Sequence, residues 1–147
     1  AKEEINVPLI LENITYNVDL PWNNIEESKY LAELVYRSNC GLLLDVTNLY
    51  INSHNHNYDP IGFLNNIPPD SITQLHFVGG IEKDGKWIDS HGHNTQEEIF
   101  NLIEEVLKYA PVKGVILERD TNFPEFNILI DELNRVRELG RKYNRWD

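Results

Sequence analysis

Four apolar runs in this sequence have the composition of strands buried on both faces of a sheet. They cover residues 7–14, 41–48, 71–78 and 114–120. Continuous apolar runs of this length are typical of parallel sheets, whereas half-exposed strands alternate apolar and polar residues. The four runs therefore restrict the chain to folds built around a parallel sheet.

Helical patterns follow the runs. Amphipathic spacing predicts helices over residues 24–38, 95–109 and 125–143, with a short one over 60–65. Thr95 and Glu98 have the spacing of a capping box at the start of one of them. A strand followed by a helix, repeated four times, predicts right-handed βαβ crossovers and an α/β fold.

Each run carries a carboxylate or an imidazole towards its carboxyl end, at Glu12, Asp45, His76 and Glu118. The carboxyl ends of parallel strands lie on one side of the sheet, so these groups are expected to converge where α/β folds place active sites. Taken singly, Asp45 or Glu118 could be a helix cap and His76 a core histidine, but a buried Glu12 needs a partner. Together the four suit Mn, Fe, Co or Zn.

Residues 74–94 hold two further candidate ligands. Gly79 and Gly80 are interpreted as a turn that ends the third run. Asp89 and His91 stand one residue apart, so in an extended segment both side chains project to the same side. This pair could supply a second ion, or Asp89 could form an Asx turn. Three other histidines are interpreted as loop residues or substrate contacts: His54 and His56 in a polar loop over 52–60, and His93.

Length, charge and cysteine content restrict the number of domains, the class of partner and the cellular compartment. A chain of 147 residues with 41% hydrophobic residues is expected to form one domain over 1–147. The net charge of −11 argues against nucleic-acid or anionic-membrane partners, and residues 135–145 read as a solvated basic helix face. The single Cys40 suits a reducing compartment, and no apolar run has the length of a membrane span or a signal core. We expect a cytoplasmic protein.

Five motifs, in order, carry a resemblance to a known family. They are VPLILEN, LLLDVTNLYIN followed by Asn55 and His56, LHFVGG, IDSHG and ILERD. Glu12, Asp45, His76 and Glu118 on successive strands resemble the metal set of the xylose isomerase-like TIM barrels. The motifs resemble the C-terminal half of one family in that superfamily, the multinuclear non-haem iron-dependent oxidases, whose known members act on cysteine residues of ribosomally made peptides.

The resemblance implies a fold, a cofactor and a set of site residues. The fold would be about four βα units, half of a (β/α)8 barrel that needs roughly 250 residues. The cofactor would be two or three irons, with Mn, Co or Zn as alternatives. Glu12 would bridge two irons, Asp45, His76 and Glu118 would bind one, and Asp89 and His91 would extend the cluster. Substrate or supporting contacts would come from Asn13, Asn48 and His56, and no catalytic residue is assigned.

Three functions remain open from the sequence. The first is the peptide-modifying iron oxidase, or its C-terminal half. The second is a sugar isomerase or epimerase that uses a divalent metal, against which the Asp89 and His91 motif argues. The third is a non-catalytic fragment or assembly subunit. Four parallel strands leave two open sheet edges, so a separate N-terminal half or a second copy is an expected partner beside the peptide.

Overall fold

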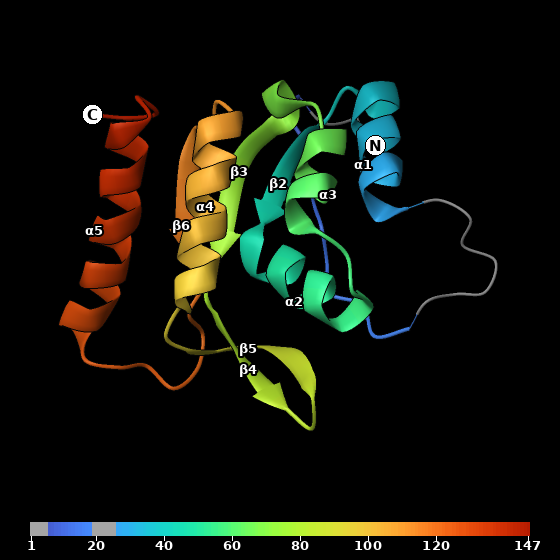
Figure 1. The fold of residues 1–147 in the computed structure, drawn as a ribbon. Coiled ribbons are helices and arrows are strands. Elements are labelled where there is room, and N and C mark those ends of the chain that lie inside the picture. The colour runs from blue at the N-terminus through green and yellow to red at the C-terminus, as the bar shows by residue number, and fades with distance from the viewer. Residues whose placement is uncertain (1–5, 19–25) are drawn as a thin grey trace.

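The computed structural model describes residues 6–18 and 26–147 and has an α/β fold (Figure 1). Its elements, in chain order, are β1 (Ile10–Glu12), α1 (Glu27–Ser38), β2 (Gly41–Asp45), α2 (Val46–His56), α3 (Pro60–Asn66), the 3-10 turn η2 (Pro69–Ser71), β3 (Ile72–Phe77), β4 (Gly79–Lys83), β5 (Lys86–His93), α4 (Glu97–Tyr109), β6 (Gly114–Leu117) and α5 (Phe126–Lys142). No helix among them is long and apolar enough to span a membrane.

The main sheet has four parallel strands in the order β1-β2-β3-β6, which confirms the predicted α/β fold with a parallel sheet. Strands β4 and β5 pair antiparallel and form a separate hairpin below the sheet (Figure 1). The predicted strand over residues 7–14 is shorter than expected, because only Ile10–Glu12 pairs with β2. Residues 24 and 25 of the first predicted helix lie outside the described residues, and α1 is described from Glu27.

The helices cover one face of the sheet, with α3 and α4 in front of the strands in Figure 1. Leu42, Leu44 and Leu75 are fully buried on that face and form the core with the apolar side of α4. Side chains alternate between the faces of a strand, so Leu43 and Ile116 lie on the other face. Ile116 is 46% exposed there. One face of this parallel sheet is therefore packed, and the other is open.

The polar stretch predicted as a loop over 52–60 is largely helical. Helix α2 runs from Val46 to His56, and the strand predicted over 41–48 ends at Asp45. The Asp45 side chain caps this helix by accepting a hydrogen bond from the backbone N–H of Asn48. Asn52 and Ser53 are buried in it, and Asn52 donates to the carbonyl of Ile14. The prediction was wrong because these polar side chains are paired inside the protein rather than solvated.

Two local predictions around the hairpin were also wrong. Thr95 does not cap α4, because its hydroxyl and backbone N–H both donate to the carboxylate of Glu132 on α5. Gly79 does not sit in a turn with positive φ but begins β4. It is required by a close approach, since a Cβ atom there would lie 2.0 Å from the carbonyl oxygen of Asn94.

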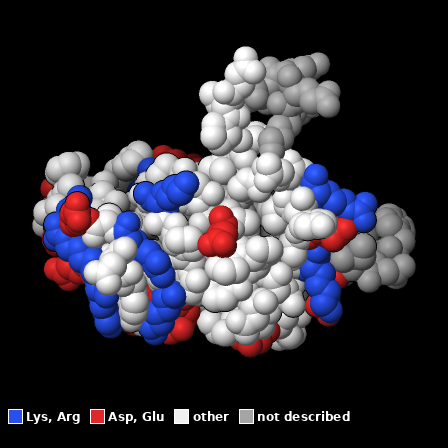
Figure 2. Space-filling view, turned by 90° about the horizontal axis from the view of Figure 1, so that it is seen from above, with Lys and Arg blue, Asp and Glu red and all other residues white. Residues whose placement is uncertain are grey.

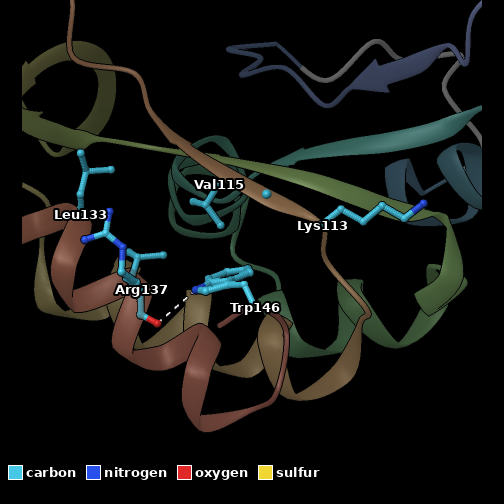
Figure 3. A pocket seen from close by; sticks show the side chains of 7 residues that line it. Lys113, Val115, Leu133, Arg137 and Trp146 are labelled. Carbon is cyan, nitrogen blue, oxygen red and sulfur yellow. Dashed lines mark hydrogen bonds between the residues drawn. The ribbon is translucent and has the colours of Figure 1, made fainter.

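Two basic residues of α5 are paired with acidic residues of α4. Arg135 donates to Glu97, and Lys142 lies 2.8 Å from Glu104. Figure 2, which views the end of the molecule opposite the carboxyl ends of the strands, has Lys and Arg gathered on the side of α5. Between α5 and the edge strand β6 lies a pocket where Trp146 donates to the Arg137 carbonyl (Figure 3). The ion pairs between α5 and α4 support the interpretation of residues 135–145 as a solvated helix face.

Candidate metal centre

Each strand of the parallel sheet places one ionisable side chain at its carboxyl end. Glu12 and Asp45 are the last residues of β1 and β2, His76 lies in β3, and Glu118 directly follows β6. One ligand atom from each of the four lies within 4.8 Å of all the others. Asp45 and His76 are direct register partners, and the Glu118 N–H donates to the Phe77 carbonyl. The sheet register therefore brings together the four residues predicted to converge.

The imidazole of His76 lies at the centre of this group. Its Nδ1 is 3.0 Å from Glu118 Oε2 and 3.4 Å from Glu12 Oε1, and its Nε2 is 3.2 Å from the side-chain nitrogen of Gln74. Nδ1 is therefore the nitrogen that faces the carboxylates. If Nδ1 binds a metal, Nε2 carries the proton. A flip of the Gln74 side-chain amide by about 180° then places its oxygen where it can accept a hydrogen bond from Nε2.

Gln74 is a site residue that was not predicted from the sequence. It lies two residues before His76 on β3, so both side chains project from the same face of the sheet. The signal that could have found it is this spacing, because a histidine ligand usually needs a partner for its second ring nitrogen.

Asp45 is buried, and both burial and the neighbouring carboxylates destabilise its ionised form. Burial raises the pKa of Asp45 to about 7; the hydrogen bond from the Asn48 N–H opposes this, and the charges of Asp89, Glu12 and Glu118 add to it. The carboxylates of Asp89, Glu12 and Glu118 thus repel the ionised form of Asp45. A divalent cation among them would relieve that repulsion, and three carboxylates with one imidazole are hard oxygen and nitrogen donors suited to such an ion.

Asn13 and Asn48, predicted to contact substrate or support the ligands, hold the strand ends together. The Asn13 side chain donates to the Asp45 carbonyl (3.0 Å) and accepts from the Asp45 N–H (2.8 Å). The Asn48 side chain donates to the Asn13 carbonyl (3.0 Å). Its Oδ1 is buried without a hydrogen-bond partner among the described residues.

Asp89 and His91 form a pair beside the group of four rather than within it. Both lie on β5, and His91 Nε2 is 2.9 Å from Asp89 Oδ1. Burial opposes protonation of His91, but the carboxylates of Asp89, Glu118 and Asp120 outweigh it and raise the pKa of His91. Because Asp89 also acts on Asp45, the hairpin lies close enough to the four residues to share their electrostatic field.

The remaining histidines lie outside this group. His56, predicted as a substrate contact, ends α2; its ring stacks on Tyr16 at 4.2 Å, and its Nε2 lies 2.8 Å from the Tyr16 carbonyl oxygen. His54 is also helical rather than in a loop, with Nδ1 2.9 Å from the Tyr50 carbonyl oxygen. His93 ends β5, 2.8 Å from the hydroxyl of Ser90.

The sequence model of a family described as RiPP precursor modification enzyme MbnB/TglH/ChrH matches residues 1–141. The chain belongs to this family. RiPP precursors are ribosomally made peptides that are modified after translation. The MbnB/TglH/ChrH family is the one that the five sequence motifs resembled, so the predicted family is confirmed.

Relatives of the chain include UPF0276 proteins from several bacteria. The protein from Streptomyces avermitilis is 37% identical over 142 residues, which are 97% of this chain and 29% of the relative. Those from Acaryochloris marina and Chromobacterium violaceum are 34% and 33% identical over 92% and 95% of this chain, and 49% and 50% of their own length. The chain thus spans about half the length of these two relatives and less of the first.

Proposed function

We propose that this chain forms the C-terminal half of a metal-dependent oxidase that modifies cysteine residues of a ribosomally made peptide. The observation that supports it best is the convergence of Glu12, Asp45, His76 and Glu118 within 4.8 Å, in a member of the MbnB/TglH/ChrH family. The family description supplies the peptide precursor as the class of substrate.

We infer that the metal is iron, with two or three ions per site. Asp45, His76 and Glu118 would hold one ion, Glu12 would bridge it to a second, and Asp89 and His91 would extend the cluster. Bound iron would supply the redox chemistry that oxidises the cysteine with O2. The chain's own side chains position the site: Gln74 orients His76, and the hydrogen bonds of Asn13 and Asn48 hold the strand ends together.

The open face of the sheet supports the proposal that the fold is half of a (β/α)8 barrel. Purely parallel sheets are normally covered on both faces, yet here Ile116 is exposed on the face that carries His76. Strands β1 and β6 form the two edges of the sheet. Further exposed apolar side chains follow β6, at Phe123, Phe126 and Ile130. A separate N-terminal half-barrel or a second copy of the chain would cover these surfaces.

The test is elemental analysis of metal per chain on protein purified without chelator under low oxygen, run with its mass in solution. We expect iron in the wild-type protein and its loss in Glu118→Gln, whose side chain keeps its size but loses its charge. Glu33→Gln is the matched control, because Glu33 pairs with Arg37 on the surface of α1. It should keep the wild-type metal content.

Three outcomes would contradict the proposal. Metal content that is unchanged in Glu118→Gln would mean that the four residues are not the ligands. A redox-inactive divalent ion with isomerase activity on a sugar would favour the second function inferred from the sequence. Absence of metal from both the single chain and an assembled form would favour a non-catalytic role.

A further inference from the structure

A second cavity, of about 460 Å³, lies between the helices and shares no lining residue with the metal centre. It is bounded by the first turns of α1 and α3 and by the end of α2. Its volume is within the range of pockets that bind small molecules or single side chains. This cavity is not used by the proposed reaction.

Two side chains that line the cavity each have a buried oxygen with no hydrogen-bond partner among the described residues. These oxygens are Oε2 of Glu27, on the first turn of α1, and the hydroxyl of Tyr58, just before α3. Both atoms are buried, although the side chains are only partly so. Buried oxygens of this kind are normally paired, so each needs an explanation. Both side chains line the same cavity, which points to one ligand that both would contact.

Aromatic and acidic side chains line the cavity beside Ser28, Gly62 and Asn66. Tyr16 and His56 stack with their ring centroids 4.2 Å apart, and Tyr58 and Phe63 stack at 5.9 Å. Glu26 and Asp59 add two further carboxylates, and no Lys or Arg is found among the described residues that line the cavity. Aromatic faces and carboxylates attract cations and repel anions.

We propose that this cavity binds an organic cation, an alkylammonium or guanidinium group that donates hydrogen bonds to Glu27 and Tyr58. The aromatic rings would enclose its hydrocarbon part. Such a group occurs in lysine and arginine side chains and in free amines. An ammonium donates three hydrogen bonds and a guanidinium five, so one ligand can pair with both oxygens. A bare metal ion fits less well, since the cavity is large and, among the described residues that line it, only Glu27 and Tyr58 have a buried oxygen without a partner.

The electrostatics of Glu27 agree with this assignment. Burial raises the pKa of Glu27 to about 7, and the nearby His56 opposes the rise only partly. Burial, Glu27 and Tyr16, in that order, also raise the pKa of the Tyr58 hydroxyl, which keeps its proton. A cation seated against Glu27 would stabilise its ionised form and remove the cost of burying it.

The test is calorimetric titration of the 147-residue chain with n-butylguanidinium and n-butylammonium at pH 8, where Glu27 is ionised. We expect saturable binding with one site per chain, and none with n-butanol, which has the same alkyl chain without the charge. Glu27→Gln should weaken binding about ten- to a hundredfold, the usual value of a hydrogen bond to a charged group. Tyr58→Phe should weaken it less, and Glu33→Gln, on the surface of the same helix, should not change it.

Glu27→Gln also removes a poorly solvated charge, so the variant is expected to fold. Absence of saturable binding to the wild-type chain, or equal binding by the wild type and Glu27→Gln, would overturn the proposal. The blocked amino acids N-acetyl-lysine and N-acetyl-arginine methylamide distinguish the source of the cation. If they bind as tightly as the alkyl cations, a peptide side chain fits the cavity; if only the alkyl cations bind, the ligand is a free amine. Because metal content is measured separately, failure here leaves the proposed oxidase untouched.

Discussion

Asn13 and Asp45 exchange two hydrogen bonds in which the side chain of one pairs with the backbone of the other. The Asn13 amide oxygen accepts from the Asp45 N–H, and the amide nitrogen donates to the Asp45 carbonyl. This pairing continues the contact between β1 and β2 past Glu12, the last residue of β1. It therefore fixes Glu12 and Asp45, two of the four candidate ligands, at one distance from each other.

Replacement of Asn13 by alanine should weaken both the fold and the metal centre. The change leaves a buried N–H and a buried carbonyl of Asp45 unpaired, at a cost of about 2–4 kcal/mol in the free energy of unfolding. Denaturant unfolding measures this cost, and metal titration measures the loss of affinity. Asn101→Ala, on the exposed side of α4, is the control and should change neither quantity. Equal stability of Asn13→Ala and wild type would contradict the role of this pairing.

Replacement of Gln74 by alanine should lower metal affinity without a large loss of stability. His76 would lose the partner of its Nε2 atom, and loss of such a partner typically costs about ten- to a hundredfold in affinity. Gln74→Glu keeps an oxygen acceptor and should restore most of it. Thr73→Ala lies on the same strand but on the opposite face, so it is the matched control. If Gln74→Ala binds metal as the wild type does, Gln74 does not orient His76.

Replacement of Gly79 by alanine should displace the hairpin that carries Asp89 and His91. The added Cβ would lie 2.0 Å from a backbone oxygen, which cannot move aside as a flexible side chain could. We expect a loss of about 3 kcal/mol or more in the free energy of unfolding. Gly114→Ala is the control, because nothing lies within 4 Å of its Cβ position. A Gly79→Ala protein as stable as Gly114→Ala would contradict this packing.

The sequence predicted the parallel sheet because a strand that is buried in such a sheet has a continuous run of apolar residues, and each strand has one. It also predicted that Glu12, Asp45, His76 and Glu118 converge, because strand ends in a parallel sheet share one side. It failed where a contact between distant segments decides the structure. The local sequence around Asn52 is typical of a loop, but its side chain donates a hydrogen bond to the distant carbonyl of Ile14. The local sequence around Thr95 is typical of a helix cap, but its hydroxyl donates to Glu132 of α5.

The hairpin and the second cavity were missed for the same physical reason. Gly79 and Gly80 were interpreted as a turn and no hairpin was predicted, since the pairing of β4 with β5 depends on which residues face each other. The Asn55 side chain bonds the backbone of Trp87 and ties α2 to this hairpin, a contact that no local pattern reveals. Glu27 lies in the first turn of a helix predicted from the sequence, but its burial next to α3 does not follow from the helical pattern.

Glu27 should lower the stability of the chain as pH rises from about 4.5 to about 7, in addition to the effect of Asp45. The pKa of Glu27 is about 7 in the folded protein and 4.5 as its ordinary value, so the folded state binds more protons between these values. Unfolding then becomes easier with rising pH. We expect this carboxyl to account for a decrease of about 1–2 kcal/mol in the free energy of unfolding, less than the full pKa shift implies because the side chain is only partly buried.

Denaturant unfolding at pH 5 and pH 8, without metal or added amine, measures the total decrease. Glu27→Gln should reduce the decrease by this amount, whereas Glu33→Gln should leave it unchanged. An equal pH dependence in Glu27→Gln and wild type would mean that this carboxyl is solvated.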